Sequence, residues 1–269
     1  MVSIEKDPVA YRTLLLRAFL RKFGTNIPPQ YYEFLNGYTD REPDWSTLYP
    51  QEWGEACDET KCLELGQSAA DQLLRKRANL LHEKHDGRTV LLGGPPCQSY
   101  SLVGRSRNAG NTSYDPERDE RQSLYQEFVN VLEYLQPAIA IMENVKGMLS
   151  ARHGDQPIFP KVMSKLKDSS RSEGYRLFAL ASESGAQSWD EGAEPKDFLV
   201  HADKHGVPQA RHRVFIICIR HDIAKLLPED RIPRLLPRAE TVTVNDIIGM
   251  MPRLRSRLSC GDSAVTWKS

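Results

Sequence analysis

A cysteine at position 97 has the surroundings of a reactive thiol. It stands in Gly-Gly-Pro-Pro-Cys-Gln-Ser at 93–99, a proline-braced loop that follows the apolar run at 88–92. Ligands of α/β sheets bind at the carboxyl ends of strands, so a loop in this place brings Cys97 to a ligand. An ordinary thiol has a pKa of about 8.5, and a nucleophilic cysteine therefore needs a cationic neighbour or a proton acceptor. Cys97 is a candidate nucleophile, whereas Cys218 lies inside a later apolar run and is a candidate core residue.

A carboxyl group follows the next apolar run in the same manner. Glu143 begins the tripeptide Glu-Asn-Val after the run at 138–142, so we expect it at the same edge of the sheet. A carboxyl group that leaves an apolar strand is partly desolvated, which raises its pKa and favours the protonated form that donates a hydrogen bond. The alternative is a structural role in which Glu143 caps the turn that follows.

Two arginines and a glutamine alternate ahead of a third apolar run. The segment 206–213 reads Gly-Val-Pro-Gln-Ala-Arg-His-Arg and leads into the run at 214–219. Alternation along an extended chain puts Gln209, Arg211 and Arg213 on one face. Their donors could stabilise a thiolate or hold a phosphate and a carbonyl oxygen, and the alternative is a solvated edge strand.

Apolar periodicity places these groups in an α/β protein. Asp7-Pro8 is typical of a helix start, because a capping carboxylate precedes a proline. Strands that alternate with helices predict right-handed βαβ units and a mainly parallel sheet with helices on both faces. The segment 25–60 has no clear period and is expected to be a surface insertion. The pattern predicts helices over about 8–23 and 66–82 and around 124–135 and 158–166, and strands at 2–5, 88–92, 138–142, 175–180 and 214–219.

Length and charge exclude several classes of protein. The 269 residues balance 36 Lys and Arg against 36 Asp and Glu, which excludes a globally basic nucleic-acid binder and an acidic tail. No apolar run reaches about 18 residues and the amino-terminal segment carries charges, so neither a membrane span nor a signal peptide is predicted. Five cysteines do not indicate a disulfide scaffold, and we expect a soluble intracellular protein.

The charge balance conceals two segments of opposite sign. Residues 38–64 hold eight acidic and two basic residues, a net charge of −6. Residues 204–257 hold eleven basic and five acidic residues, a net charge of +6. This asymmetry indicates that one face meets a polyanion, although an arginine-rich solvated loop would give the same counts.

Together, and in this order along the chain, the three segments resemble the DNA (cytosine-5) methyltransferase family. The matching residues are Gly-Pro-Pro-Cys-Gln-Ser at 94–99, Glu-Asn-Val at 143–145 and Gln-x-Arg-x-Arg at 209–213. Supporting matches are Asp-Glu-Arg-Gln-Ser-Leu-Tyr-Gln-Glu-Phe at 119–128, Gly174-Tyr175, and Ile-Glu-Lys-Asp-Pro at 4–8. The resemblance covers most of residues 1–219 outside the insertion, and it implies a Rossmann-like methyltransferase fold that uses S-adenosyl-L-methionine.

For the reaction, the resemblance implies methyl transfer to C5 of a cytosine in double-stranded DNA. Cys97 matches the family nucleophile, which adds to C6 of the base so that C5 can take the methyl group. Glu143 would donate a hydrogen bond to N3 of the base and accept one from its exocyclic amine. The base must leave the duplex to reach such a site. The family motifs assign further contacts with the base, the thiolate or the DNA to Arg211, Arg213, Gln98, Ser99, Asn144 and Gln209.

The resemblance also implies where the cofactor would bind. Glu5, at the end of a strand, would accept hydrogen bonds from both ribose hydroxyls, the usual task of an acidic residue in that position. The acidic residue that meets adenine in the family has no clear counterpart. The other matching cofactor positions are Lys6, Gly94, Pro96 and Leu124.

Some family features have no counterpart in this sequence. The family domain opens with a strand and a Phe-x-Gly-x-Gly loop, which are absent here, and it continues into a target-recognition domain. We expect residues 1–220 to form a partial catalytic domain, with an insertion at about 25–87 and the first strand missing. Residues 221–269 would lead towards the absent domain. A truncated product, a split subunit and an expressed fragment all fit, so we expect little methylation by the chain alone and consider a complementary methyltransferase chain as a partner.

Three other interpretations compete with this one. A non-catalytic DNA-binding or regulatory remnant would keep the fold without the reaction. A zinc module would use Cys57, Cys62, His82 and His85, but their spacings lie outside the usual ranges and no metal is assigned. A thiol hydrolase would need a histidine with Asn or Asp at strand ends to activate the cysteine.

The remaining histidines give the hydrolase no support. His153, His201 and His205 are interpreted as loop residues. The family interpretation suits a bacterial modification enzyme of the cytoplasm that is associated with the nucleoid.

Overall fold

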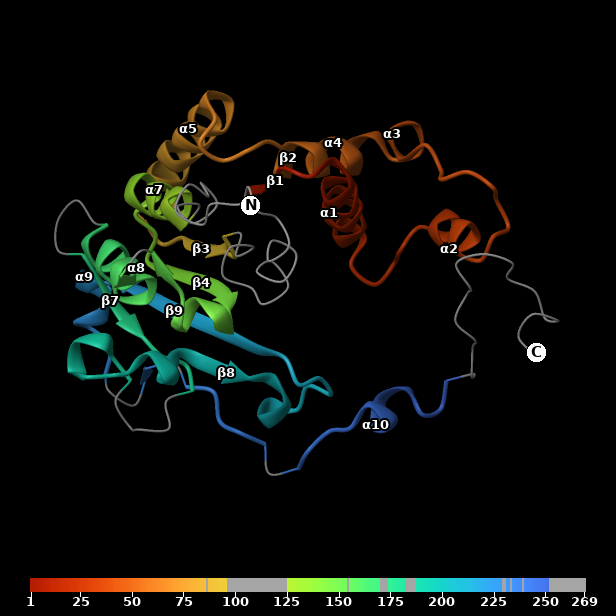
Figure 1. Cartoon of the computed structure of the whole chain (residues 1–269). Helices are drawn as coiled ribbons and strands as arrows, with labels where there is room; N and C mark the ends of the chain where they lie inside the picture. Colours follow the sequence, from red (N-terminus) through yellow and green to blue (C-terminus); the bar gives the residue numbers. More distant parts are fainter. Residues whose placement is uncertain are drawn as a thin grey trace, which may run out of the picture.

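The computed structural model describes residues 1–85, 87–95, 125–153, 155–169, 174–181, 187–228, 231–232, 234–238 and 240–251. Helices and strands alternate along most of this length (Figure 1). The α-helices are α1 (Pro8–Leu20), α2 (Pro29–Leu35), α3 (Trp45–Leu48), α4 (Pro50–Glu59), α5 (Ser68–His85), α7 (Tyr125–Leu135), α8 (Ile158–Asp168), α9 (His221–Ala224) and α10 (Val244–Ile248). The strands are β1 (Ser3–Glu5), β2 (Thr60–Cys62), β3 (Val90–Gly93), β4 (Ile139–Val145), β5 (Arg152–His153), β6 (Gln156–Pro157), β7 (Tyr175–Phe178), β8 (Leu199–His201) and β9 (His212–Arg220).

The main sheet has five strands, in the order β3–β4–β9–β7, with β8 also beside β9. β3 and β4 are parallel, whereas β9 is antiparallel to β4, β7 and β8. Four strands therefore run in one direction, as the sequence predicts, and β9 runs against them. The connection from β8 to β9 is short, and a parallel pair would need a crossover of about a dozen residues or more, so β9 must return antiparallel.

One face of the main sheet, the covered face, packs against helices α7 and α8. Successive residues of a strand point to opposite faces, and Ala140, Met142, Ile216 and Cys218 share this one. Each of them is at most 1% exposed. Burial raises the pKa of the Cys218 thiol, which confirms the prediction of a core cysteine. The helices contribute the side chains of Phe128, Val129, Leu132, Phe159, Val162, Met163 and Leu166.

The opposite face, the open face, is buried at one side only. Ile217 and Ile219 are 3% and 1% exposed, since they pack with Ala224 of α9. Val90 and Leu92 of β3 point to the same face and are 59% and 69% exposed. A short, uninterrupted apolar run such as 88–92 is typical of a buried parallel strand, and this expectation is wrong for these two residues. Within the described ranges β3 pairs with β4 on one edge and has no partner on the other.

The first 62 residues form a smaller N-terminal unit, in which β1 and β2 make a separate parallel sheet. Helix α1 begins as the sequence predicts. The Asp7 carboxylate accepts hydrogen bonds from the amides of Val9 and Ala10, and Pro8 occupies the first helical turn, where it has no amide to leave unpaired.

Aromatic side chains build a second core inside the N-terminal unit. Phe19 is fully buried, and its ring centroid lies 5.1 Å from that of Trp45 and 5.4 Å from that of Trp53. The segment 25–60 was expected to be an irregular surface insertion, yet it contains α2, α3, α4 and part of this core. Periodicity could not predict these helices, because each has at most ten residues and shows too few turns of a repeat.

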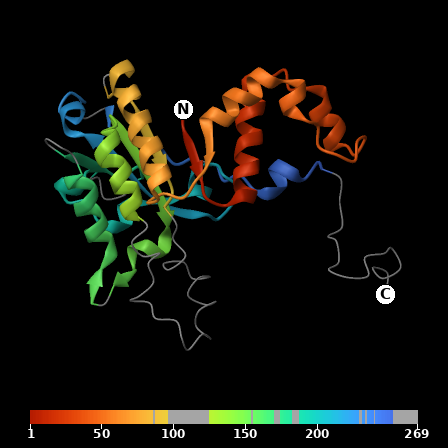
Figure 2. The same ribbon diagram turned by 90° about the horizontal axis from the view of Figure 1, so that it is seen from above.

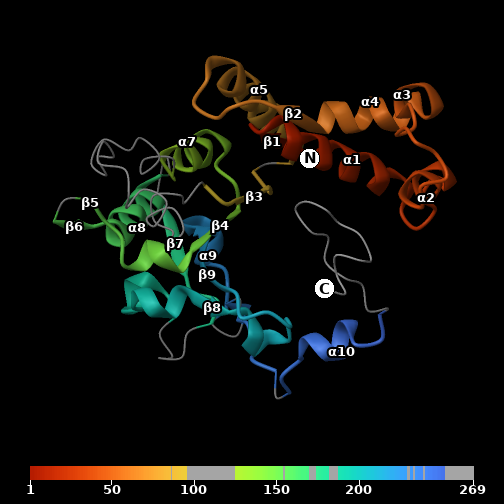
Figure 3. The same ribbon diagram turned by 45° about the vertical axis from the view of Figure 1, so that its right-hand side comes forward.

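Helix α5 connects the N-terminal unit with the main sheet. Arg77 of α5 pairs with Asp58 of α4 at 2.5 Å, and the guanidinium of Arg75 lies 4.7 Å from the centre of the Tyr134 ring on α7. Burial raises the pKa of Tyr134 to about 12. Figures 2 and 3 show α1 to α4 on one side of the main sheet, with α5 beside α7. Helix α5 thus contacts α4 of the N-terminal unit and α7 of the main-sheet part.

The other predicted elements are confirmed with shifts of a few residues at their ends. The predicted strands at 138–142 and 214–219 are longer in the structure, where β4 continues to Val145 and β9 begins at His212. Within the described residues, no helix combines the length and the apolar character needed to cross a membrane.

Candidate active site

Glu143 and Arg213 meet at one end of the main sheet, on its open face. Glu143 is near the carboxyl end of β4 and Arg213 is near the amino end of β9. Because the two strands are antiparallel, these ends coincide, and Arg213 lies opposite Val145. The Nε of Arg213 is 3.0 Å from Oε1 of Glu143, and the two side chains are 23% and 37% exposed. The carboxyl group therefore has a cationic partner and access to solvent.

This environment differs from the one predicted for Glu143. The sequence predicts a partly desolvated carboxyl group, and the structure adds the cationic partner Arg213 to a side chain that is 37% exposed. The capping alternative is wrong, since the 3-10 helix Lys146–Leu149 begins after Val145 without a side-chain capping bond. The antiparallel neighbour β9 carries Arg213 and so determines the surroundings of Glu143 at the end of β4.

Gly94 lies directly against Glu143. A Cβ atom at position 94 would stand 3.1 Å from Oε2 of Glu143, closer than ordinary van der Waals contact. Glycine at this position therefore lets the backbone that leaves β3 approach the carboxyl group. Since Oε1 faces Arg213, the second oxygen is the one directed towards the segment that begins at Gly94.

The remaining motif residues surround this contact in different ways. Asn144 points to the covered face, is 3% exposed, and accepts a hydrogen bond of 2.8 Å from the amide of Val145. It stabilises the backbone at the end of β4. Gln209 and Arg211 are exposed in the connection before β9, where the Arg211 amide donates to the Gln209 carbonyl at 2.7 Å. Of the three residues expected on one face, Arg213 is the one with a contact to Glu143.

Several predicted residues lie outside the described part of the chain. These are the candidate nucleophile Cys97, the cofactor residues Pro96 and Leu124, and the DNA residues Gln98 and Ser99.

The predicted ribose ligand stands on the other sheet. Glu5 ends β1, and its Oε1 accepts a hydrogen bond of 2.8 Å from the amide of Asp7. A carboxylate can accept about four hydrogen bonds, so the chemistry of Glu5 fits a pair of ribose hydroxyls. Lys6 is 67% exposed and pairs with Glu64 at 2.5 Å. Because β1 and β3 belong to separate sheets, no strand pairing fixes the position of Glu5 relative to Gly94 within the described residues.

A comparison with protein families decides what this arrangement belongs to. The family profile of the C-5 cytosine-specific DNA methylases matches residues 67–262, which include the Glu143–Arg213 contact. The chain belongs to this family. The α/β architecture of this methylase chain is accordingly the Rossmann-like methyltransferase fold that the sequence predicts.

Known relatives of the methylase chain include Type II methyltransferases. M.Bpa9945I of Bacillus paralicheniformis is 29% identical over 62% of this chain and 33% of its own length. M1.HphI of Haemophilus parahaemolyticus is 30% identical over 69% of this chain and 39% of its own length. The solved methyltransferase EhMeth of Entamoeba histolytica is 14% identical, with a TM-score of 0.40, over 90% of this chain and 58% of that one. The matched part of the chain thus spans about a third of the length of M.Bpa9945I and somewhat more of M1.HphI.

The residues of the alternative zinc module do not come together. Cys57 is on α4, Cys62 ends β2, and His82 and His85 are on α5. Among the described residues, the one group of three or more His, Cys, Asp or Glu with ligand atoms close enough for a metal ion lies elsewhere, at His201, Asp203 and His212.

Sequence reasoning missed this group. It interprets His201 as a loop residue, whereas His201 ends β8, opposite His212 in β9. The available signal was His-x-Asp at 201–203 followed nine residues later by a histidine, but only the pairing of β8 with β9 closes that distance.

Proposed function

We propose that this chain is the base-binding part of a DNA (cytosine-5) methyltransferase. The reaction is transfer of a methyl group to C5 of a flipped-out cytosine in double-stranded DNA. The observation that supports this most is the Glu143–Arg213 contact beside Gly94, where the Pro-Pro-Cys segment leaves β3. Membership of the methylase family supplies the reaction class.

The reaction needs a nucleophile because C5 of cytosine is too weakly nucleophilic to attack a sulfonium methyl group. The Cys97 thiolate adds to C6, and the C5–C6 π electrons then make C5 nucleophilic as an enamine. C5 takes the methyl group as the methyl–sulfonium bond breaks, which leaves a neutral thioether. A solvent base then accepts the C5 proton, and elimination of the thiolate restores the aromatic ring. When bound, S-adenosyl-L-methionine supplies the methyl group.

Glu143 holds the pyrimidine ring during these reaction steps. Its Oε2 faces Gly94, so this oxygen is the one that would contact N3 of the base. Arg213 fixes the carboxyl group from the other side through Oε1. Arg211 is exposed at the same end of the sheet and would contact O2 of the base or a phosphate. Gln98, Ser99 and Gln209 would contact DNA around the flipped base.

We infer that this methylase chain works with a further segment that carries a strand and a helix. Parallel strands are normally covered on both faces, yet Val90 and Leu92 are exposed beside the edge of β3 that has no partner strand among the described residues. A strand placed between β1 and β3 would join the two sheets and bring Glu5 and Gly94 to one edge, where Glu5 would hold the ribose. A complementary methyltransferase segment supplies this strand.

We also propose how the chain divides into segments. Residues 1–220 form a partial catalytic domain, with 25–87 as its insertion, and residues 221–269 lead to the part that recognises the DNA target. The net charge of +6 over 204–257 suits a surface that faces the phosphate backbone of nucleoid DNA.

Covalent trapping tests the proposal. The full chain is incubated with S-adenosyl-L-methionine and a duplex that contains 5-fluorocytosine, alone and after mixing with the unmatched remainder of M.Bpa9945I. Since fluorine cannot leave as a proton does, a working cysteine stays attached to the DNA. We expect a denaturation-stable adduct in the mixture and little in the chain alone. Cys97→Ser abolishes the adduct, and Cys62→Ser, a change at an exposed cysteine, retains it.

Two outcomes would contradict parts of the proposal separately. Robust adduct formation and methyl transfer by the chain alone would remove the need for a complementary segment. A mixture that binds the duplex but forms no adduct would favour a non-catalytic DNA-binding remnant.

A further inference from the structure

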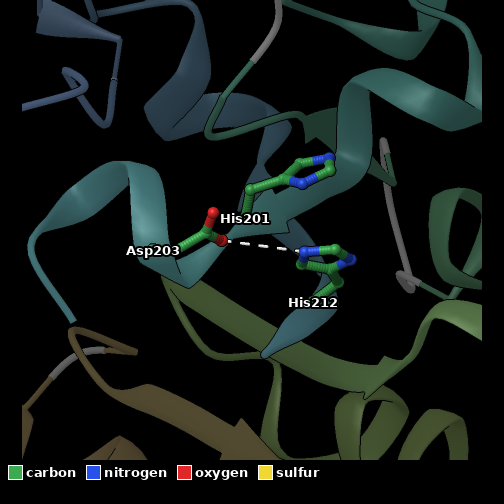
Figure 4. A group of neighbouring side chains, drawn as sticks. All are labelled: His201, Asp203 and His212. Carbon is green, nitrogen blue, oxygen red and sulfur yellow. Dashed lines mark ion pairs between the residues drawn. The ribbon is translucent and has the colours of Figure 1, made fainter. Parts of the chain in front are cut away.

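His201, Asp203 and His212 form a cluster with the composition of a metal site. Each offers one ligand atom, and these atoms lie within 4.8 Å of one another. Figure 4 shows the Asp203 carboxylate facing the ring of His212, with His201 alongside. We propose that this cluster binds a divalent transition-metal ion of the zinc class, at a site separate from the cysteine and glutamate chemistry of the methylase.

The two histidines are held together by the sheet. His201 is the last residue of β8 and lies directly opposite His212, the first residue of β9. Residues in such a cross-strand pair have neighbouring side chains, and the two ring centroids are 4.2 Å apart. Two adjacent imidazoles would repel each other if both were protonated. A shared cation uses both rings in their neutral form, since metal binding takes the unprotonated nitrogen.

Asp203 completes the set from the 3-10 helix Ala202–His205, which follows β8 at once. Its Oδ1 lies 3.7 Å from Nε2 of His212, a distance for an ion pair but too long for a hydrogen bond. This oxygen is buried, and within the described part of the structure it has no hydrogen-bond partner. A buried carboxylate oxygen without a hydrogen bond is unfavourable, and a cation between the three side chains would satisfy it.

The geometry requires small movements to bind a metal. Zinc bonds of about 2.0 to 2.1 Å place neighbouring tetrahedral ligands roughly 3.3 Å apart, so each ligand atom has to move by less than about 1 Å. Side-chain rotation supplies this, because all three side chains are partly exposed. Two imidazoles and one carboxylate suit Zn²⁺, Co²⁺ or Ni²⁺ better than Mg²⁺ or Ca²⁺, which prefer oxygen ligands.

Nearby cations oppose a metal ion, and the fold limits their effect. Alternation along β9 sends His212 to the face opposite Arg213, whose guanidinium is already paired with Glu143. Arg211 also precedes His212 by one residue and is exposed to solvent, where its charge is screened. Three protein ligands leave one position open, as in zinc sites that exchange a water molecule.

Metal binding at this cluster would restrict the connection between β8 and β9. The cluster lies at the two ends of the connection 202–211, which carries Gln209 and Arg211. The sheet already pairs the two ends at His201 and His212, and a bound ion would add Asp203 to this pair and so restrict the connection further.

Zinc titration of the purified full chain tests the site. After treatment with a chelator, the protein is titrated with ZnCl₂ by calorimetry, and its metal content is measured. We expect one zinc ion per chain. Replacement by Co²⁺ should give visible bands of nitrogen and oxygen ligation without the thiolate charge-transfer band that Cys57 or Cys62 would produce.

Matched variants identify the ligands. His201→Gln, His212→Gln and Asp203→Asn are each expected to weaken zinc affinity by roughly 100-fold. Loss of a residue that only hydrogen-bonds to a metal ligand already costs about 10- to 100-fold, so loss of a ligand should cost at least the upper value. His205→Gln changes a histidine of the same short helix, whose Nδ1 contacts the Leu236 carbonyl, and should leave the affinity unchanged. Circular dichroism confirms that each variant is folded.

The proposal has definite ways to fail. A folded wild-type chain that binds no zinc ion, or an affinity that falls with Cys62→Ser or His205→Gln instead, would overturn it. If His212→Gln does not fold, Asp203→Asn decides, because that side chain is 44% exposed and its replacement keeps the shape.

Discussion

The two faces of the main sheet are built from similar residues and serve different ends. Ala140, Met142 and Ile216 on the covered face are at most 1% exposed beneath α7 and α8. On the open face, exposure rises from Ile217 at 3% to Leu92 at 69%. The open face also ends in the Glu143–Arg213 contact. Burial on one side therefore supplies stability, while the other side keeps apolar side chains and the Glu143–Arg213 pair accessible to solvent.

The largest difference between the faces should appear in the free energy of unfolding. Ile216→Ala leaves a cavity beneath two helices and should cost about 3 kcal/mol, whereas Leu92→Ala at an exposed position should cost less than about 1 kcal/mol. Chemical denaturation of the two variants measures both values. Equal losses would mean that Leu92 is covered in solution, and the contrast between the faces would be lost.

The cysteines should show the same contrast in reactivity. The pKa of Cys218 is raised by complete burial, and the charged thiolate that reacts is disfavoured there at any pH in the ordinary range. We expect iodoacetamide to label Cys62, which is exposed, at least about 100-fold faster than Cys218 in the native chain. Mass spectrometry of timed samples measures the two rates. Similar rates before unfolding would show that the covered face opens readily.

The Glu143–Arg213 pair should matter little for stability and much for activity. Both side chains are partly exposed, so a double-mutant cycle with Glu143→Gln and Arg213→Gln should give a coupling of about 0.5 to 1 kcal/mol in unfolding. In the mixture of this chain with the remainder of M.Bpa9945I, Glu143→Gln should lower methyl transfer by about 100-fold or more, because an amide cannot act as the acid at N3 of the base. A coupling above about 3 kcal/mol would identify the pair as a structural support instead.

The smallest effect on folding is expected for Leu92→Lys. A charge at an exposed edge position should change the free energy of unfolding by less than about 0.5 kcal/mol. The same change should prevent a strand and helix from covering β3, because it would bury an unpaired charge. Adduct formation by the mixed chains is compared between Leu92→Lys and the matched change Leu226→Lys, at a leucine that is 81% exposed elsewhere. Equal yields would argue against docking at β3.

Much of the molecule follows from local sequence. The start of α1 is fixed by a carboxylate that caps two amides and a proline that needs no partner. The apolar runs that become β4 and β9, and the position of Glu143 at a strand end, are readable because these signals extend over few residues. The family motifs supplied the methylase identity in the same way. The short helices α2 to α4 were unreadable, since their stability comes from an aromatic core assembled with α1.

The sequence by itself determined the α/β class, the order of the elements and the residues with chemical potential. Only the tertiary structure decided which of them meet. The antiparallel return of β9 brought Arg213 to Glu143 and His212 to His201, across separations of 70 and 11 residues along the chain. The tertiary structure also leaves Val90 and Leu92 exposed on one face of β3. Such outcomes depend on strand direction and on what covers a surface, and both are set by contacts between distant segments.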